Sequence, residues 1–194
     1  MWSRCNGLVL LIPTFPTWPA LEAVFTTNLK LPPVDKTASA LAFSPSPVIV
    51  TSGAVSLGAH ELDYKSRPTS MKKLQVASSV GQIKLINEYQ TIFSRYNLKI
   101  AQVLITKNLI DDREQFINTT QALNELLSQN IIPVINENDI VATEELKFGD
   151  NDRLSAIVSI IVNASKLLII TNKEGLYDFN PDKNSEAKVI DFIQ

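Results

Sequence analysis

Short apolar segments alternate with helical patterns from residue 48 onward, and this alternation constrains the fold more than any other feature of the sequence. Segments rich in Ile, Leu and Val, typical of buried strands, lie at 48–51, 99–106, 131–136 and 166–172. Between them, apolar residues recur at three- and four-residue spacing, which predicts amphipathic helices over about 70–96, 111–129 and 152–163. The pattern predicts an α/β protein, a three-layer α/β/α sandwich whose mainly parallel sheet carries helices on both faces.

The composition changes abruptly near Pro47. Residues 1–47 contain seven of the ten prolines, both tryptophans and the single cysteine, but only five charged residues. Proline removes a backbone donor and clashes with the preceding helical turn, so this stretch cannot sustain a long helix. We expect residues 1–47 to be a leader separate from the domain at 48–194, either disordered or read from a shifted frame. A secretory signal is the other interpretation, disfavoured because its apolar run GLVLLIP is short and followed by prolines.

Size and charge exclude several classes of function. A chain of 194 residues with 45% hydrophobic residues can bury a core, and a net charge of −2 offers no basic field for nucleic acid. Cys5 cannot form an internal disulfide, and His60 alone argues against a histidine-based metal site. No apolar run reaches the roughly 18–20 residues that span a membrane. We therefore expect a cytoplasmic protein without a resident metal, nucleic acid or membrane partner.

Polar clusters follow three of the predicted strands. They are TSGA at 51–54, NEND at 136–139 and TNKEG at 171–175. In an open parallel sheet, ligands bind beyond the carboxyl ends of the strands, so these clusters should share one rim. Ser52 and Gly53 lie where a strand turns into a helix, and their backbone N–H groups could receive an anion. The alternative is that Ser52 only caps that helix.

Residues 136–152 hold six carboxylates and three asparagines. A solvated loop is one interpretation. A calcium loop is excluded because Ile140 and Val141 occupy positions where an EF-hand needs ligands and glycine, and no His or Cys lies near enough for a transition metal. Asparagine both donates and accepts, whereas ionised aspartate only accepts. A mixed set of this kind suits a zwitterion, with carboxylate on the amides and ammonium on the acids.

Several motifs together resemble the glutamate 5-kinases of the amino acid kinase family. They are TSGAVSLG (51–58), VGQ (80–82), DDREQFINT (111–119), INENDIVATEELKFGDNDRLSA (135–156) and LLIITNKEGLYDFNP (167–181). The pairing of INEND with GDND separates this group from the acetylglutamate, carbamate, aspartate and uridylate kinases of the family. The resemblance covers about residues 48–194. It implies an amino acid kinase-like fold, incomplete at both ends, and ATP-dependent phosphorylation of the γ-carboxylate of L-glutamate, the first step of proline biosynthesis.

The resemblance also implies roles for individual residues. The expected glutamate-binding positions are Ser52, Gly53, Ala54, Asp139 and Asn151, with Gly53 and Ala54 at the rim where the substrate approaches. Thr171 and Asn172 match nucleotide contacts, although Asn172 replaces the usual aspartate. Asp150 matches a catalytic acid that organises the lysines of the family. The resemblance implies ATP and Mg²⁺ as cofactors, feedback by proline, and a homo-oligomer.

The sequence departs from the family at two lysines that neutralise charge during phosphoryl transfer. The first would fall near residues 8–15, which read LVLLIPTF, and the second would lie beyond Gln194. Removing a preorganised charge commonly costs on the order of 10²–10³ in rate. We therefore expect weak or absent turnover by this chain alone. The alternative function is a catalytically inactive remnant that binds glutamate or proline.

Overall fold

The computed structural model describes residues 8–12, 47–141, 151–170, 175–179, 184 and 186–190. The strands are β1 (Leu8–Ile12), β2 (Val48–Val50), β3 (Lys99–Ile105), β4 (Ile131–Glu137) and β5 (Lys166–Ile170). The helices are α2 (Ala54–Glu61), α3 (Met71–Ser94), α4 (Arg113–Ser128) and α5 (Asn151–Ile161), with short 3-10 helices η1 (Lys107–Ile110) and η2 (Asp139–Val141). The strands and helices predicted from the sequence are all present, with ends shifted by up to two residues.

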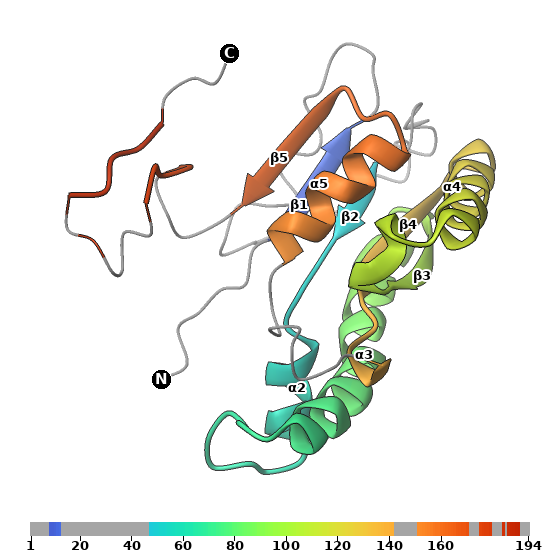
Figure 1. Cartoon of the computed structure of the whole chain (residues 1–194). Coiled ribbons are helices and arrows are strands. Elements are labelled where there is room, and N and C mark those ends of the chain that lie inside the picture. Colours follow the sequence, from blue (N-terminus) through green and yellow to red (C-terminus); the bar gives the residue numbers. More distant parts are fainter. Residues whose placement is uncertain are drawn as a thin grey trace.

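The five strands form one sheet in the order β3-β4-β2-β1-β5 (Figure 1). β3 pairs with β4 and β4 pairs with β2, both in parallel, whereas β1 is antiparallel to its neighbours β2 and β5. Four strands therefore run in one direction and β1 runs against them. This mainly parallel open sheet confirms the predicted α/β fold class.

Strand β1 comes from the stretch that composition set apart from the rest of the chain. Leu8 pairs with Ile170 and Leu11 pairs with Val48, so this segment lies between β2 and the edge strand β5. The rest of residues 1–46 lies outside the described part of the chain. The proposed boundary near residue 47 remains a prediction.

Helices pack on both faces of the sheet, because successive side chains of a strand point to opposite sides. Val48 and Val50 lie in a core cluster with residues of α4 and α5, whereas Ile49 lies in a second cluster with Phe93 of α3. Figure 1 shows α5 across one face of the sheet and α3 behind it. The buried β2 is thus the centre of a three-layer arrangement, and its carboxyl end lies between the two helical layers.

Helices α2 and α3 cross at very short distance. A Cβ atom at Gly58 would lie 1.7 Å from Ala77 O, and one at Gly81 would lie 1.8 Å from Ala54 O. Only glycine permits such backbone contact, since any side chain would occupy the space of a carbonyl group. Gly81 therefore fixes the first residue of α2, and with it the turn that follows β2.

Helix α4 begins later than the sequence pattern suggested. Asp112 is its N-cap residue, and its Oδ1 accepts hydrogen bonds from the backbone N–H groups of Glu114 and Gln115, both at 3.0 Å. This capping is worth about 1 kcal/mol and sets the start of the helix at Arg113 rather than near Asp111.

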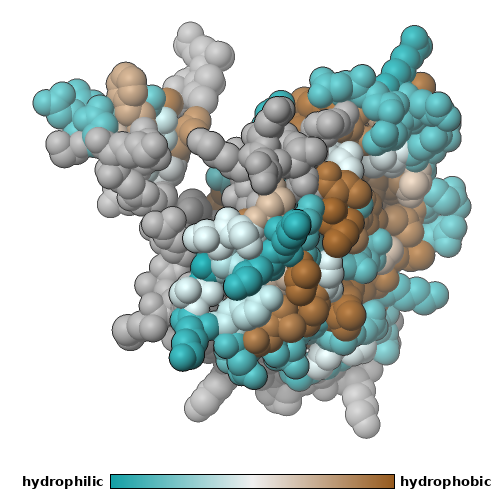
Figure 2. Space-filling model, turned by 60° about the horizontal axis from the view of Figure 1, so that its bottom comes forward, coloured by the Kyte–Doolittle hydropathy of each residue, from teal (hydrophilic) through white to brown (hydrophobic). Residues whose placement is uncertain are grey.

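Some hydrophobic residues reach the surface, and Figure 2 shows a band of them across the face that is turned forward in that view. Exposed apolar side chains of α3 and η2 include Val76, Ile83, Ile140 and Val141. Within the described residues, no helix is both long enough and apolar enough to cross a membrane.

Candidate functional site

The candidate site begins where β2 leaves the sheet. The N–H group of Thr51 donates to Ile135 O at 2.8 Å and so extends the pairing with β4 by one residue. Gly53 then adopts φ +104°, a left-handed conformation that favours glycine, and serves as the N-cap of α2. Among the described residues, no atom lies within 4 Å of the position a Cβ would take at Gly53. The turn therefore leaves open space beside the start of α2.

Ser52 does not cap this helix. The N-cap is Gly53, and no side chain caps α2. The Oγ atom of Ser52 is buried and has no hydrogen-bond partner among the described residues. The capping alternative is therefore wrong, and the hydroxyl of Ser52 stays available at the rim. Ala54, the first residue of α2, is buried, and only its backbone groups could contact a polar ligand.

Asn151 connects the ends of β2 and β4. It is the first residue of α5, is only 7% exposed, and donates both amide hydrogens, one to Thr51 O and one to Asn136 Oδ1 at 3.0 Å. Asn136 Oδ1 also accepts from Glu137 N at 2.8 Å, which fixes it as an oxygen and requires Asn151 to present its NH₂ group there. This differs from the expectation that the amides donate to a ligand carboxylate, because Asn151 has no donor left.

The side-chain oxygen of Asn151 differs from its nitrogen in its hydrogen bonding. Asn151 Oδ1 is buried and has no hydrogen-bond partner in the described part of the chain. A buried polar atom left unpaired costs about 1–3 kcal/mol, so native structures normally supply a partner. Asn151 Oδ1 is therefore suited to accept a hydrogen bond from a ligand.

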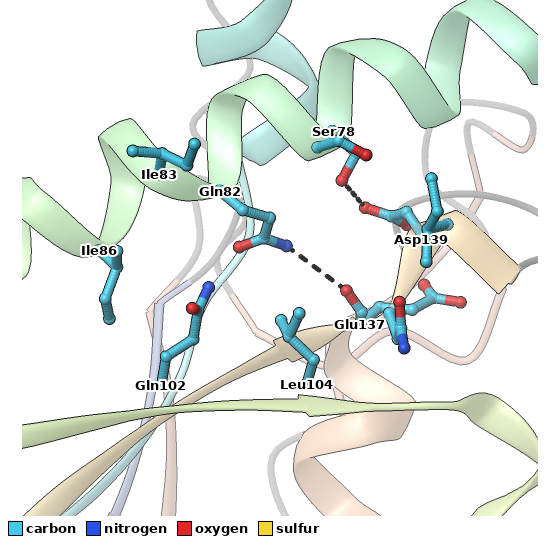
Figure 3. A pocket seen from close by; sticks show the side chains of 11 residues that line it. Ser78, Gln82, Ile83, Ile86, Gln102, Leu104, Glu137 and Asp139 are labelled. Atoms are coloured by element: carbon cyan, nitrogen blue, oxygen red, sulfur yellow. Dashed lines mark hydrogen bonds between the residues drawn. The ribbon is translucent and has the colours of Figure 1, made fainter.

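Asp139 lies on η2, three residues beyond Asn136, and is 8% exposed. Its Oδ2 accepts a hydrogen bond from the hydroxyl of Ser78 on α3 (Figure 3). The preceding Asn138 donates its backbone N–H to Ile105 O at 2.8 Å, which ties the turn to the end of β3. The carboxylate of Asp139 is thus held at the same carboxyl edge of the sheet as Asn136, with which Asn151 is bonded.

A cavity of about 320 Å³ adjoins Asp139, between α3 and the ends of β3 and β4 (Figure 3). Its lining residues are Ser78, Ser79, Gln82, Ile83, Ile86, Gln102, Leu104, Glu137, Asn138, Asp139 and Ile140. Among the described residues of this lining, the charged side chains are two carboxylates, Glu137 and Asp139, and none is a lysine or arginine. This chemistry favours a cationic group such as an ammonium over an anion.

Tyr89 contacts Thr51, the residue that follows β2, and so supports the rim. Its hydroxyl lies 2.8 Å from Thr51 Oγ1, and its ring stacks on Phe93 with centroids 6.4 Å apart. Burial raises the pKa of Tyr89 above its ordinary value, and the hydrogen bond with Thr51 opposes this shift. The phenol is therefore neutral at physiological pH, and it orients the residue that precedes Ser52.

The structure brings together part of the predicted set. Ser52, Gly53 and Ala54 follow β2, while Asn151 is bonded to Thr51 beside them. Asp139 lies along the same rim, on the α3 side. Asp150, Thr171 and Asn172 lie outside the described residues. Among those that are described, no group of three or more His, Cys, Asp or Glu side chains could hold a metal ion.

Sequence reasoning missed the residues that support the site. Asn136 lay within the NEND motif but had no assigned role, and Ser78 lay outside every polar cluster. A signal for Ser78 existed in the sequence. Gln75, Ser78 and Gln82 follow one another at helical spacing beside the apolar positions of α3, forming a polar strip on a helix expected to be amphipathic.

Comparisons with known proteins show the family to which the chain is similar. The model of a family described as the amino acid kinase family matches residues 26–194. Glutamate 5-kinase of Haemophilus influenzae (strain PittGG) is 48% identical over 147 residues, which cover 76% of this chain and 40% of the relative. Glutamate 5-kinase of Prochlorococcus marinus (strain AS9601) is 48% identical over 143 residues, covering 74% of this chain and 40% of the relative. Glutamate 5-kinase 1 of Bacillus subtilis (strain 168) is 46% identical over 146 residues, with 75% and 40% covered. The chain thus spans about 40% of the length of these curated relatives.

Proposed function

The chain belongs to the amino acid kinase family, and from this premise we propose that it forms the amino-acid-binding part of an ATP-dependent L-glutamate kinase. The reaction would transfer the terminal phosphoryl group of ATP to the γ-carboxylate of L-glutamate and yield L-glutamyl 5-phosphate, the first step of proline biosynthesis. Relatives named glutamate 5-kinase support this choice of substrate. The chemistry of the rim supports it independently.

The observation that carries the proposal is the set of acceptors at the ends of β2 and β4. Asn151 Oδ1 and Ser52 Oγ are buried without partners among the described residues, and the carboxylate of Asp139 lies along the same edge. An α-ammonium group offers three donors and a positive charge. In the proposal, Asp139 and Asn151 receive the ammonium, because neither has a donor to offer a carboxylate. Ser52 completes the contact through its hydroxyl, which both donates and accepts.

The γ-carboxylate of the substrate needs donors, which the start of α2 can supply. The backbone N–H groups of Gly53 and Ala54 lie at the amino end of an eight-residue helix, where the helix dipole favours an anion. The open space beside Gly53 leaves room for such an approach. In the proposed reaction a γ-carboxylate oxygen attacks the terminal phosphorus, the bond to the bridging oxygen breaks, and ADP leaves. No covalent bond to the protein is required.

For ATP and Mg²⁺ we propose roles for three residues that lie outside the described part of the chain. Thr171 and Asn172 would contact the nucleotide, and Asp150 would act as the catalytic acid that organises charge around the phosphates. The described residues do not themselves form a metal site. Mg²⁺ would arrive bound to ATP, as it commonly does in kinases, and would offset phosphate charge. The proposal assigns it no ligand from the described residues.

The first test is ligand binding by the purified 194-residue chain. L-Glutamate at a hundredfold excess over Kd should stabilise the fold by about 2.7 kcal/mol, which corresponds to a rise in Tm of roughly 5–10 °C for a domain of this size. L-Aspartate, which is one methylene shorter, is the control and should give a clearly smaller shift. A melt that L-glutamate leaves unchanged would refute glutamate binding by this chain.

The second test separates transfer from binding. With MgATP, L-glutamate and hydroxylamine, an acyl phosphate product is trapped as the glutamyl hydroxamate. Hydroxamate above the no-ATP control supports a working kinase. Binding without hydroxamate supports the alternative function, a catalytically inactive protein that binds glutamate or proline.

The proposal extends to regulation and assembly. L-Proline should compete with L-glutamate in the thermal-shift assay if it acts as a feedback ligand. Sedimentation velocity should reveal a homo-oligomer, and a fluorescent fusion should be found in the cytoplasm. Each outcome can fail separately without affecting the binding test.

A further inference from the structure

We propose that a polar strip on α3, formed by Gln75, Ser78 and Gln82, holds the segment 137–140 in place, and that Ser78 is a positioning residue for Asp139. The strip lies on one face of the helix, because residues three and four positions apart are neighbours on a helix surface. The part of this inference that concerns ligand affinity rests on the proposed function. The part that concerns the position of the segment does not.

Each residue of the strip contacts a different point of the segment. Gln82 Nε2 donates to Glu137 O at 3.4 Å, Ser78 Oγ donates to Asp139 Oδ2, and Gln75 Nε2 donates to Ile140 O at 3.1 Å. Figure 3 shows the bonds from Ser78 and Gln82 side by side across the cavity. The segment is thus held through two backbone carbonyls and one carboxylate, so its position depends on α3.

Ser78 differs from the other two because it bonds the functional group itself. It is only 2% exposed, so its hydroxyl donates to Asp139 away from competing water. A hydrogen bond to an ionised carboxylate is roughly twice as strong as one between neutral groups. It also fixes the otherwise broad terminal torsion of the aspartate, so the carboxylate need not be ordered when a ligand binds.

Ser94, at the end of α3, provides the control. Its hydroxyl donates to Thr91 O at 3.1 Å, within its own helix, and its side chain is exposed. Ser94→Ala therefore removes the same atom from the same helix without touching the segment 137–140 or the residues that line the cavity. A general effect of losing a serine hydroxyl from α3 would appear in both variants.

The experiment compares wild type, Ser78→Ala, Ser78→Thr, Gln75→Ala and Ser94→Ala in the full 194-residue chain. Two quantities are measured: the Kd for L-glutamate by calorimetry, and the exchange rates of the backbone amides of residues 138–141. For Ser78→Ala we expect about tenfold weaker binding, in line with the loss of one hydrogen bond to a charged group, together with faster exchange. Ser78→Thr keeps a hydroxyl and should restore both values, and Ser94→Ala should match wild type.

The outcomes separate this inference from the proposed function. If wild type binds no L-glutamate, the proposed function fails and the exchange rates alone decide the inference. Unchanged exchange and affinity in Ser78→Ala would overturn it, as would equal effects in Ser94→Ala or a Ser78→Thr variant as weak as Ser78→Ala. Should Ser78→Ala fail to fold, Gln75→Ala takes its place. Faster exchange of residues 138–141 in that variant supports the polar strip, and unchanged exchange contradicts it.

Discussion

Replacing Gly81 by alanine sets two well-understood effects against each other. Gly81 lies in the middle of α3, where alanine is intrinsically preferred over glycine by about 1 kcal/mol. Helix propensity alone therefore predicts a more stable protein. The crossing of α2 and α3 predicts the opposite, because the new Cβ would lie 1.8 Å from Ala54 O and 2.6 Å from Gly58 N.

The geometry gives the size of the effect. Real Cβ atoms essentially never approach closer than 3.0 Å, so α2 must move by about 1.2 Å along the line to Ala54 O. The atoms in the way belong to the backbone and cannot rotate aside. Overpacking costs about 1–3 kcal/mol, and a clash with backbone lies at the upper end of that range, so about 2 kcal/mol of destabilisation remains after the gain in propensity. We expect Tm to fall by roughly 4–8 °C.

Circular dichroism during thermal melting measures this change, with Gly175→Ala as the matched control. Among the described residues, the new Cβ at Gly175 would meet only Val189 Cγ1, a side-chain atom at 3.0 Å, so Tm should change little. Because the displaced residue is Ala54, the glutamate-induced shift should weaken as well. A Gly81→Ala protein with an unchanged or higher Tm would refute the close crossing and its role in fixing the turn after β2.

Three further predictions concern the rim. Asp139→Asn should abolish the thermal shift caused by L-glutamate. The Tm of the free protein should change by no more than about 3 °C, because a turn at the sheet edge contributes little to the core. If L-glutamate still raised the Tm of this variant, Asp139 would not belong to the site. Asn151→Asp places an oxygen against Thr51 O and Asn136 Oδ1, and should lower the free energy of unfolding measured in urea by about 2–4 kcal/mol. An unchanged midpoint of urea denaturation would contradict the assigned amide orientation. Burial raises the pKa of Tyr89, so this residue contributes fully to stability at pH values below its unfolded-state pKa of 10.0. The contribution is lost as the pH rises through the higher pKa of the folded state. Tyr89→Phe should therefore flatten the loss of stability above about pH 10, and equal alkaline slopes in the two proteins would argue against it.

The periodicity of the sequence was sufficient for most of the fold. Val48 and Val50 pack on one face of the sheet and Ile49 packs on the other, as expected for a strand buried on both sides. The antiparallel β1 was not foreseen, because an isolated apolar run followed by a proline-rich segment carries no local signal for its partners. Its pairing with β5 joins residues that lie more than 150 positions apart, and only the assembled sheet brings them together.

The candidate site was predictable to the extent that it follows strand ends. The rule that ligands bind beyond the carboxyl ends of parallel strands, together with the resemblance, made Ser52, Asp139 and Asn151 candidates, and their role in binding remains a prediction. The supporting contacts were not predictable in this way. Ser78 lies 61 residues before Asp139, and only the packing of α3 on the sheet brings them into contact. The orientation of Asn151 likewise depends on Thr51, which lies 100 residues earlier.

The two hydrogen bonds of Asn151 have a consequence for the order of events during synthesis. One reaches back 100 residues to Thr51 and the other 15 residues to Asn136, so the acceptor set is assembled only when all three segments have met. A nascent chain that has emerged as far as η2 already contains Ser52 and Asp139, yet its rim lacks the residue that joins the two strand ends. Capture of an amino acid by a ribosome-bound chain would therefore begin only after Asn151 has left the exit tunnel, which makes ligand retention a reporter of the meeting of these three segments.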